Sequence, residues 1–452
     1  MLLAGVGCGE APVQRPTNLV LVVIDTLRAD HLASYGYARS TSPNLDRFGS
    51  ENLTFADARS QSACTSPSMS SLLTSRSPLR LLAQPRGHMG IPEDLPSLAE
   101  VLKQNNFWTV AISASPIVRR SPSRANRFGE FDRGFDVFDE SCSGEPGACL
   151  NEVAARTLDL VTEPFFLYLH YMDVHGPYNP PADFERRFSE FIHQPQLLRE
   201  GRMEQLQAMS RKYGKPITPE EIAYLIDLYD DGIAYTDERI GELLADLSRR
   251  GLLENSIIAI ASDHGEGFGE RGYLGHCRIP LFEGMVATPL FLRIPGVATR
   301  GRIEGPVQNL DIFPTVLDYL GIDAGDLVLE GTSLRAAIEG QGVTQPFAFS
   351  AQGTEVSVND AAHTLILDLD DGVARLYDRQ FDPEHNEDIA GREPGARTRL
   401  RAALDAWLEE TAPVASAIVE DAGRLERELQ ALGYLESPAD VRPKVPAPGA
   451  PR

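Results

Sequence analysis

The sequence is short of positive charge and of long apolar runs. Its 452 residues include 42 Lys and Arg against 65 Asp and Glu, for a formal net charge of −23. This balance excludes the general basic surface that nucleic-acid binding requires. No apolar run approaches the ~20 residues of a membrane-spanning helix, and 42% hydrophobic residues exclude wholesale disorder. What remains is a large acidic globular protein, with one α/β domain and an appended subdomain or with several smaller domains.

Cysteine is also scarce, with five residues, and no C-x-x-C spacing of a zinc or redox site occurs. Cys8 ends the opening M-L-L-A-G-V-G-C, whose small residues resemble the cleavage site of a bacterial lipoprotein. The usual basic start is missing and Gly5 stands where Leu is usual, so a frayed N-terminus with an incidental cysteine is the alternative. We expect residues 1–16 to be a signal remnant and linker. A lipid on Cys8 would attach an extracytoplasmic protein, periplasmic or membrane-anchored, to a membrane.

Two further cysteines, Cys142 and Cys149, flank the polar loop S-G-E-P-G-A. A short disulfide is sterically easy across such a loop, and it suits an extracytoplasmic protein. The alternative is two free thiols in a cytosolic loop. Cys64 and Cys277 each adjoin a candidate catalytic residue, so their proximity, or even a disulfide between them, is conceivable.

Apolar, β-branched runs alternate with helical patterns over most of the chain. The strand candidates are residues 18–24, 108–114, 165–172 and 256–262. Helical periodicity precedes two of them, at 95–106 and 220–247. Continuous apolar runs are typical of strands buried on both faces, and their alternation with helices indicates a parallel sheet. We therefore predict an α/β fold with a mainly parallel sheet sandwiched by helices.

From about residue 345 the pattern changes. Short strands at 364–369 and 374–378 are separated by D-D-G, a hairpin turn signal, and a helical pattern follows at 397–410. We predict a catalytic domain over 17–344 and a small antiparallel sheet plus helix over 345–412. The tail 413–452 is expected to contain one helix, ended by Gly433, and then a Pro-rich segment.

Three polar segments carry the ligand types of a metal site. Asp25 follows the first strand candidate, and Asp263 and His264 follow the last. Thr65 lies in C-T-S-P-S, where Pro67 fits the first position of a helix. In an open parallel sheet, ligands bind beyond the carboxyl ends of the strands, so these segments could converge. Two carboxylates and an imidazole suit one divalent cation, and the helix N-terminus beside Thr65 suits an anion.

Taken singly, each segment is more often a cap, a turn or a helix start than a site. Their order along the chain is more specific. The successive motifs are I-D-T-L-R-A-D-H, T-S-P-S-M-S-S, L-H-Y-M-D-V-H-G-P-Y, S-D-H-G-E-G-F-G-E, G-H-C-R-I-P and R-L-Y-D-R-Q-F-D-P-E-H-N. By these motifs the chain resembles the sulfatase family of the alkaline-phosphatase superfamily, from about residue 18 to residue 435. The resemblance implies an alkaline-phosphatase-like fold.

The resemblance also implies roles for individual residues. The implied metal ligands are Asp25, Thr65, Asp263 and His264. Thr65 occupies the nucleophile position. His175 and His276 match positions that contact the oxygens of the ester or protonate the leaving group, so both are candidates for catalysis and for substrate binding.

Other histidines and one asparagine are assigned by context. Asn179 and His88 are placed near the substrate pocket, and the segment 183–222 is predicted to form part of the pocket wall. His170 lies inside an apolar strand and is interpreted as a core histidine. For His175 the alternative is a loop residue beside a turn, but its context H-G-P-Y-N-P-P favours a functional role.

The chain departs from the family pattern at the nucleophile. Sulfatases that use formylglycine need Cys or Ser two places before the Pro and Arg two places after it, whereas these positions hold Thr65 and Met69. Cys64 is one residue out of frame, and threonine cannot be oxidised to the required aldehyde. The D-D metal pair of the family is reduced to Asp25 and Thr26. We therefore predict no formylglycine, one divalent metal ion (Ca, Mn, Zn or Mg) and a plain hydroxyl nucleophile, with the histidine ligand slightly favouring Mn or Zn.

These features favour a metal-dependent hydrolase or transferase that acts on a small anionic ester through Thr65, with phosphoric esters favoured over sulfuric esters. Sulfuric ester hydrolysis, as in arylsulfatases, is the first alternative. The second is a surface lipoprotein that keeps the fold as a binding or scaffold module. Loss of the family's Arg and second acidic ligand favours the scaffold. It is opposed by the joint retention of five residues: Asp25, Thr65, Asp263, His264 and His276. The sequence indicates no oligomeric state.

Overall fold

The computed structural model describes residues 16–82, 90–92, 95–123, 126, 129–189, 196–199, 201–277 and 281–410. The largest sheet of these described residues has nine strands, in the order β11-β2-β10-β6-β1-β5-β3-β4, with β9 paired to β2. Their bounds are β1 Asn18–Ile24, β2 Leu53–Arg59, β3 Trp108–Ser113, β4 Val137–Asp139, β5 Phe165–Tyr171, β6 Ser256–Ala261, β9 Ala287–Thr288, β10 Leu290–Arg293 and β11 Gly301–Gln308.

Most strands of this sheet run in one direction. β1 pairs in parallel with β5 on one side and with β6 on the other, and β3 is parallel to β5 and β4. β10 runs the opposite way, antiparallel to β6 and β2, as does β9 against β2. The predicted α/β class with a mainly parallel sheet is confirmed.

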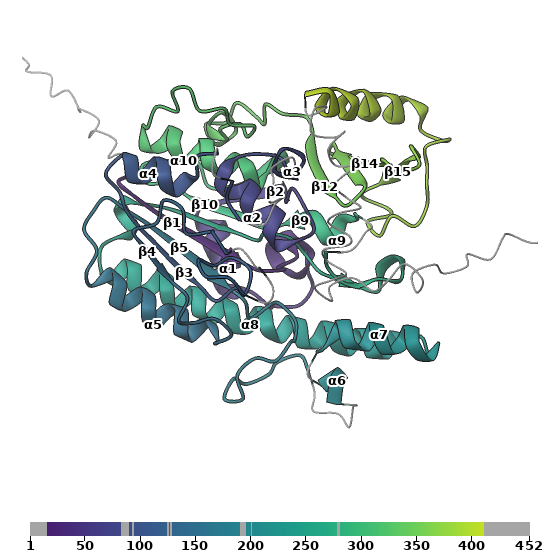
Figure 1. The fold of residues 1–452 in the computed structure, drawn as a ribbon, viewed down its shortest axis with the longest axis horizontal. Coiled ribbons are helices and arrows are strands. Elements are labelled where there is room, and N and C mark those ends of the chain that lie inside the picture. The colour runs from purple at the N-terminus through teal and green to yellow at the C-terminus, as the bar shows by residue number, and fades with distance from the viewer. Residues whose placement is uncertain are drawn as a thin grey trace, which may run out of the picture.

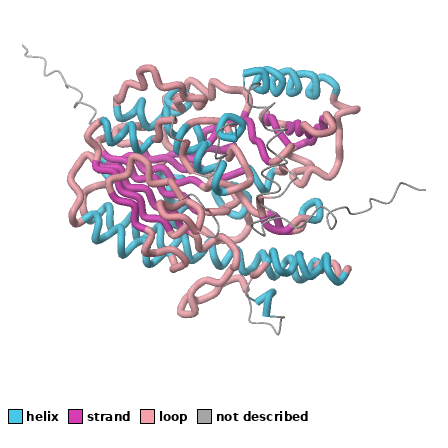
Figure 2. Tube along the Cα trace, viewed as in Figure 1, coloured by secondary structure: helices cyan, strands magenta, loops and turns pink. Residues whose placement is uncertain are grey.

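The central strand β1 sends alternate side chains to the two faces of the sheet. Leu19, Leu21 and Val23 pack in one apolar core with helices α2, α4 and α10. The residues between them pack in a second core with α1, α5 and α8. Figures 1 and 2 show these helix layers on either side of the strands. The bounds are α1 Pro43–Glu51, α2 Thr65–Thr74, α4 Leu98–Gln104, α5 Gly147–Leu158, α8 Pro219–Arg249 and α10 Ile312–Leu320.

Two of these helices begin with a reciprocal capping box. The Thr218 side chain accepts from the N–H of Glu221 at the start of α8, and the Glu221 carboxylate accepts from the N–H of Thr218. Ser97 and Glu100 make the same pair at α4. Both boxes satisfy N–H groups that a helix leaves unpaired at its start. The remaining described helices are α3 Pro78–Leu82, α6 Gln196–Arg199, α7 Met203–Tyr213, α9 Glu283–Val286 and α11 Arg335–Ile338.

A second, antiparallel sheet follows the first domain. Its strands are β12 Ala348–Gln352, β13 Glu355–Asn359, β14 His363–Asp368 and β15 Ala374–Asp378, in that order. Residues 394–410 form a helix that shares its apolar core (Figure 1). Arg379 joins this sheet to the larger one, since its guanidinium pairs with Asp57 of β2 at 2.6 Å and with Glu283 of α9 at 3.1 Å.

Several expectations concern residues at the two ends of the chain. Cys8 and the predicted helix and Pro-rich segment of 413–452 lie outside the described residues. Within the described part, no helix combines the length and apolarity that crossing a membrane requires.

A disulfide joins Cys142 to Cys149, in the first turn of α5, with the two Cα atoms 5.7 Å apart.

Candidate active site

Two neighbouring strands bring Asp25 and Asp263 together at one edge of the sheet. Asp25 comes directly after β1, and Asp263 comes two residues after β6. The two strands are adjacent and parallel, with Val23 paired to Ala261, so both chains leave the sheet at the same edge. Both aspartates have 0% exposure. The two carboxylates are therefore buried close together, with one oxygen of each within 4.8 Å of the other.

Each carboxylate keeps one oxygen without a partner. Asp263 Oδ1 accepts from the N–H of Thr26 at 3.1 Å and from the N–H of His264 at 2.8 Å. Asp25 Oδ2 lies 3.0 Å from His170 Nε2. The other two oxygens, Asp25 Oδ1 and Asp263 Oδ2, have no hydrogen-bond partner among the described residues. Buried carboxylate oxygens of this kind require a donor or a cation.

The chain turns sharply between β1 and this site. Thr26 has a φ of +59°, in the left-handed region that a β-branched residue rarely adopts and that costs roughly 1–3 kcal/mol. The strain is held by two bonds, because Thr26 donates through its N–H to Asp263 and its carbonyl accepts from Tyr229 at 2.7 Å. The strained turn therefore points the backbone after Asp25 toward Asp263.

The electrostatics of the aspartate pair favour a divalent cation. Burial and the neighbouring Asp25 carboxylate raise the pKa of Asp263 well above its ordinary value. Burial acts on Asp25 in the same direction, but the hydrogen bond from His170 and the nearby histidines lower its pKa overall. Two unpartnered carboxylate oxygens in a buried site repel each other, and one divalent cation would bind both. The residues present therefore fit the metal ion that the sequence predicts.

His264 contributes a nitrogen lone pair to this group. Its Nδ1 lies 2.8 Å from the carbonyl oxygen of Gly265. A carbonyl only accepts, so Nδ1 carries the proton and Nε2 carries the lone pair. Burial and the nearby His276 lower the pKa of His264 to about 4, which keeps the ring neutral near pH 7. Nε2 lies 3.5 Å from Asp263 Oδ2 and 4.0 Å from Asp25 Oδ1, as a third ligand would.

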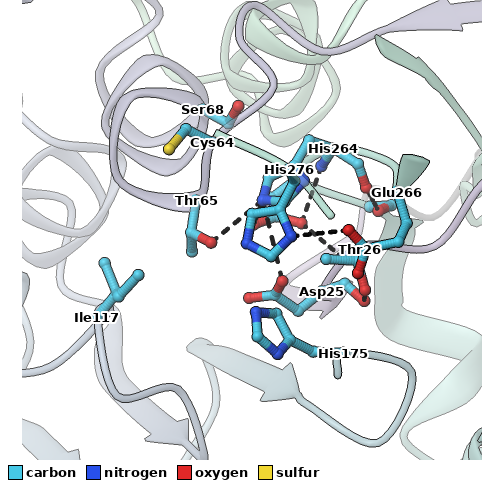
Figure 3. Close-up of polar contacts among 12 residues, drawn as sticks. Asp25, Thr26, Cys64, Thr65, Ser68, Ile117, His175, His264, Glu266 and His276 are labelled. Carbon is cyan, nitrogen blue, oxygen red and sulfur yellow. Dashed lines mark hydrogen bonds and ion pairs between the residues drawn. The ribbon is translucent and has the colours of Figure 1, made fainter. Parts of the chain in front are cut away.

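Thr65 borders the same group from the start of α2 Thr65–Thr74 (Figure 3). Its Oγ1 lies 3.2 Å from His264 Nε2, and the residue is completely buried. α2 begins at Thr65 itself, with Cys64 as N-cap, so the prediction that Pro67 takes the first helical position is wrong by two residues. Proline is tolerated throughout the first turn, because those N–H groups have no partner within the helix. Thr65 therefore lies at the positive end of the helix dipole.

His170 is buried, as expected of a core histidine, but it also contacts the site. Ligand atoms of Asp25, His170 and Asp263 lie within 4.8 Å of one another, so His170 is a possible ligand by distance alone. A carboxylate only accepts, so His170 Nε2 donates to Asp25, and the hydroxyl of Tyr168 lies 2.6 Å from Nδ1. With both ring nitrogens engaged, His170 orients Asp25 instead of offering a lone pair.

His276 is the charged histidine of the site. Its Nδ1 lies 2.9 Å from Glu266 Oε1, and the Tyr178 hydroxyl donates to Oε2 of the same carboxylate at 3.0 Å. Burial alone would lower the pKa of His276, but the Glu266 carboxylate raises it to about 9. The ring lies 4.7 Å from the ring of His264 and 4.8 Å from that of His175. A protonated His276 can therefore donate a proton near pH 7.

The remaining predicted residues differ in their placement. His175 lies beside His276, and its Nδ1 donates to the carbonyl oxygen of Gly176 at 2.5 Å. Asn179 is exposed, and its amide oxygen accepts from Arg186 at 3.2 Å. No described contact joins Asn179 to the other site residues. His88 lies outside the described residues.

The sequence did not predict that three supporting residues contact the site, namely His170, Tyr178 and Glu266. Glu266 has a weak signal, since it follows His264 by two places in S-D-H-G-E-G. Tyr178 and His170 give none, because aromatic and histidine side chains in apolar surroundings are usually part of a core. Their contacts depend on which strand ends meet.

Neither Arg28 nor Met69 supplies free positive charge to the site. Arg28 pairs with Asp30 at 2.7 Å and with Glu270 at 2.6 Å. Met69 is completely buried in the apolar core against the sheet. Among the described residues, His276 and the helix end at Thr65 offer positive charge for an anionic substrate, and a bound cation would add to it.

The profile of the sulfatase family matches residues 17–322, two thirds of the chain. The chain belongs to the sulfatase family. This sulfatase-family protein is 23% identical over 428 residues to a sulfatase from Formosa agariphila, with 83% of each chain covered. It is 26% identical over 457 residues to arylsulfatase A from Homo sapiens, with 89% of each chain covered.

The fold of this sulfatase-family protein is also similar to a solved phosphonate monoester hydrolase of Agrobacterium radiobacter. The TM-score is 0.68 at 19% identity, over 88% of this chain and 96% of that chain. The membership of the sulfatase family, within the alkaline-phosphatase superfamily, that the motifs predict is thereby confirmed. The protein is a sulfatase-family hydrolase, and its fold is shared with enzymes named for sulfuric and for phosphonic esters.

Proposed function

We propose that this protein is a metal-dependent hydrolase or transferase that cleaves phosphoric or sulfuric esters through Thr65, with phosphoric esters favoured. The observation that carries the proposal is the position of the Thr65 hydroxyl, 3.2 Å from His264 Nε2 and at the start of α2. The same nitrogen lies 3.5 Å from Asp263 Oδ2 and 4.0 Å from Asp25 Oδ1, the two oxygens that have no hydrogen-bond partner among the described residues.

The preference for phosphoric esters follows from the chemistry of threonine. A formylglycine is made from Cys or Ser, and neither occupies this position. Cys64, the nearest thiol in the sequence, is bonded to Cys277 in a disulfide. A secondary hydroxyl can still attack phosphorus and form a phospho-threonine, so the family's ester chemistry is retained without the aldehyde.

Different residues act in the attack on phosphorus and in the release of the leaving group. A divalent cation held by Asp25, Asp263 and His264 would supply the positive charge that lowers the free-energy cost of a Thr65 alkoxide. As that alkoxide forms, the Thr65 hydroxyl loses its proton to a water molecule. Thr65 Oγ1 then forms a bond to phosphorus while the bond from phosphorus to the leaving oxygen breaks. His276 gives its Nε2 proton to that leaving oxygen. Water, or the hydroxyl of an acceptor, then displaces the phosphoryl group from Thr65.

Sulfuric ester hydrolysis is the second candidate, because the named relatives are sulfatases. The test is a panel of three 4-nitrophenyl esters: the phosphate, the phenylphosphonate and the sulfate. Each is assayed with Ca²⁺, Mn²⁺, Zn²⁺ and Mg²⁺. We expect kcat/KM to be highest for one of the two phosphorus esters. A highest value for the sulfate would select the second candidate, and no turnover of any ester would contradict both.

Replacing Glu266 with glutamine should slow the cleavage of esters with poor leaving groups. Glutamine keeps an acceptor for His276 Nδ1 but removes the charge that opposes the effect of burial on the pKa of His276. We expect kcat for phenyl esters to fall about 10²-fold and kcat for 4-nitrophenyl esters to fall much less, since nitrophenolate leaves without a proton. Tyr178→Phe is the control, because it removes a hydrogen bond to Glu266 and leaves the charge. An equal loss on both esters in Glu266→Gln would contradict the assignment of His276 as the acid.

A further inference from the structure

A disulfide joins the residue before Thr65 to the residue after His276. Cys64 and Cys277 are 213 positions apart in the sequence, and their Cα atoms lie 4.6 Å apart. A backbone bond runs beside this link, because the N–H of Cys277 donates to the carbonyl of Ala63 at 2.8 Å. The segments that carry the proposed nucleophile and the proposed acid are therefore connected both covalently and by a hydrogen bond.

The Thr65 end of this link is held firmly without the disulfide. Every residue of α2, from Thr65 to Thr74, is buried. Leu72 and Leu73 pack in the apolar core that also contains Leu19, and the carbonyl of Cys64 accepts from the N–H of Ser68 at 3.1 Å. Figure 3 shows Cys64 at the start of this helix, next to Thr65.

The His276 end has less regular secondary structure around it. The strand before it, β8 Leu274–Gly275, pairs only with β7 Gly267–Phe268, and a two-stranded ribbon of this size is marginal by itself. His276 lies between two residues with positive φ, Gly275 at +88° and Cys277 at +61°. A non-glycine residue keeps such a conformation only where its surroundings hold it. The described restraints on this segment are the bond to Glu266, the ring contacts of His276 with His264 and His175, a bond from Gln352 to the carbonyl of Cys277 at 3.5 Å and the link through Cys277. Among them the disulfide is the covalent one.

We infer that the Cys64–Cys277 disulfide is a positioning element, which holds His276 at the distance from Thr65 that proton transfer to the leaving oxygen requires. The inference rests on the proposed function of Thr65 and His276. Opening the disulfide removes this covalent restraint, so His276 is displaced while Thr65 stays in α2. The protonation of the leaving group slows, whereas the attack by Thr65 is preserved.

The disulfide also makes the activity sensitive to reduction. Both cysteines are partly exposed, so a small dithiol can reach them. Reduction breaks the S–S bond and forms two thiols, while the dithiol gives up two electrons and two protons and closes into its own disulfide. The enzyme should therefore be fully active toward poor leaving groups only in an oxidising environment.

The test compares two esters of the same acid that differ in their leaving group. Phenyl and 4-nitrophenyl phosphate are assayed, or the corresponding sulfates if the enzyme cleaves those, with C64S/C277S and with wild-type protein treated with dithiothreitol. We expect kcat for the phenyl ester to fall about 10²-fold, with less than about a threefold change for the 4-nitrophenyl ester and in either KM. Serine is chosen for Cys64 because it is a strong N-cap and leaves the start of α2 intact.

The matched control is C142S/C149S, which removes the other disulfide and should leave the ratio of the two kcat values unchanged. If C64S/C277S does not fold, the wild-type protein is reduced under native conditions. Alkylation and peptide mass spectrometry then identify the opened bond, and circular dichroism verifies the fold. Unchanged kcat on both esters, or an equal loss on both, in folded protein without this disulfide would overturn the inference. If Thr65→Ala keeps full activity, the proposed function itself fails, whatever the disulfide variants do.

Discussion

Replacing Thr65 with alanine should lower kcat/KM by about 10³-fold or more, because in the proposed mechanism its hydroxyl forms the covalent intermediate. The side chain is completely buried and its Oγ1 lies 3.2 Å from His264 Nε2. Thr65→Ser keeps the hydroxyl and should retain measurable activity. The measurement is kcat/KM on the best ester of the panel, together with intact-protein mass spectra during turnover. These spectra should show a phosphoryl adduct on wild-type protein and none on Thr65→Ala.

Thr74→Ala is the matched control for this prediction. Thr74 lies on the same helix and is buried, but its hydroxyl donates to the carbonyl of Ser70 at 2.6 Å, which is a bond within the helix. We expect this variant to lose some stability and to keep its kcat. Full activity in Thr65→Ala would refute Thr65 as the nucleophile, and an adduct on another residue would reassign that role.

Replacing Asp263 with asparagine should abolish both metal binding and activity, with kcat/KM falling by about 10³-fold or more. Asparagine can keep Oδ1 as the acceptor for the N–H groups of Thr26 and His264, but it removes the charge that faces Asp25. The free protein gains by this change, because two buried carboxylates no longer repel each other. We therefore expect Asp263→Asn to fold, and to be at least as stable as metal-free wild type.

Thermal unfolding separates this effect from general damage. A cation present at 100 times its Kd should stabilise the wild-type protein by about 2.7 kcal/mol and raise its Tm, and chelation should reverse the rise. Asp263→Asn should show no such response. Asp237→Asn is the control, because Asp237 is a buried carboxylate that accepts from the N–H groups of Asn44 and Leu45. It should destabilise the protein and keep the metal response. A cation that raises the Tm of Asp263→Asn as much as that of wild type would contradict the ligand assignment.

The central strands of the sheet could be predicted nearly to the residue. The runs at 18–24 and 256–262 correspond to β1 Asn18–Ile24 and β6 Ser256–Ala261, since strands buried on both faces require continuous apolar side chains. The same criterion misses β10, which has four residues, and β11, whose sequence G-R-I-E-G-P-V-Q is polar. Strands away from the centre carry no such run, so their pairing depends on partners far along the chain.

The sequence could suggest which candidate ligands lie together, but not which residues support them. Asp25 and Asp263 follow apolar strands, and that local pattern is sufficient to suggest that they meet at one sheet edge. The pairing of Glu266 with His276 depends on the short β7–β8 ribbon, which turns the chain back on itself within ten residues. The start of α2 at Thr65 was also missed, because proline is accepted at more than one position of a first turn.

The amino-acid sequence was therefore sufficient for the family and the central strands, and it places Thr65 where the family motif has its nucleophile, since each of these depends on a local pattern. The folded chain was needed for the protonation of the site and for its restraints. It leaves Asp25 Oδ1 and Asp263 Oδ2 without partners, keeps His264 neutral, and links Thr65 to His276 through a disulfide between distant cysteines. The physical reason is that pKa values and hydrogen-bond partners depend on burial and on neighbours from other strands. A pattern along the chain does not contain that information.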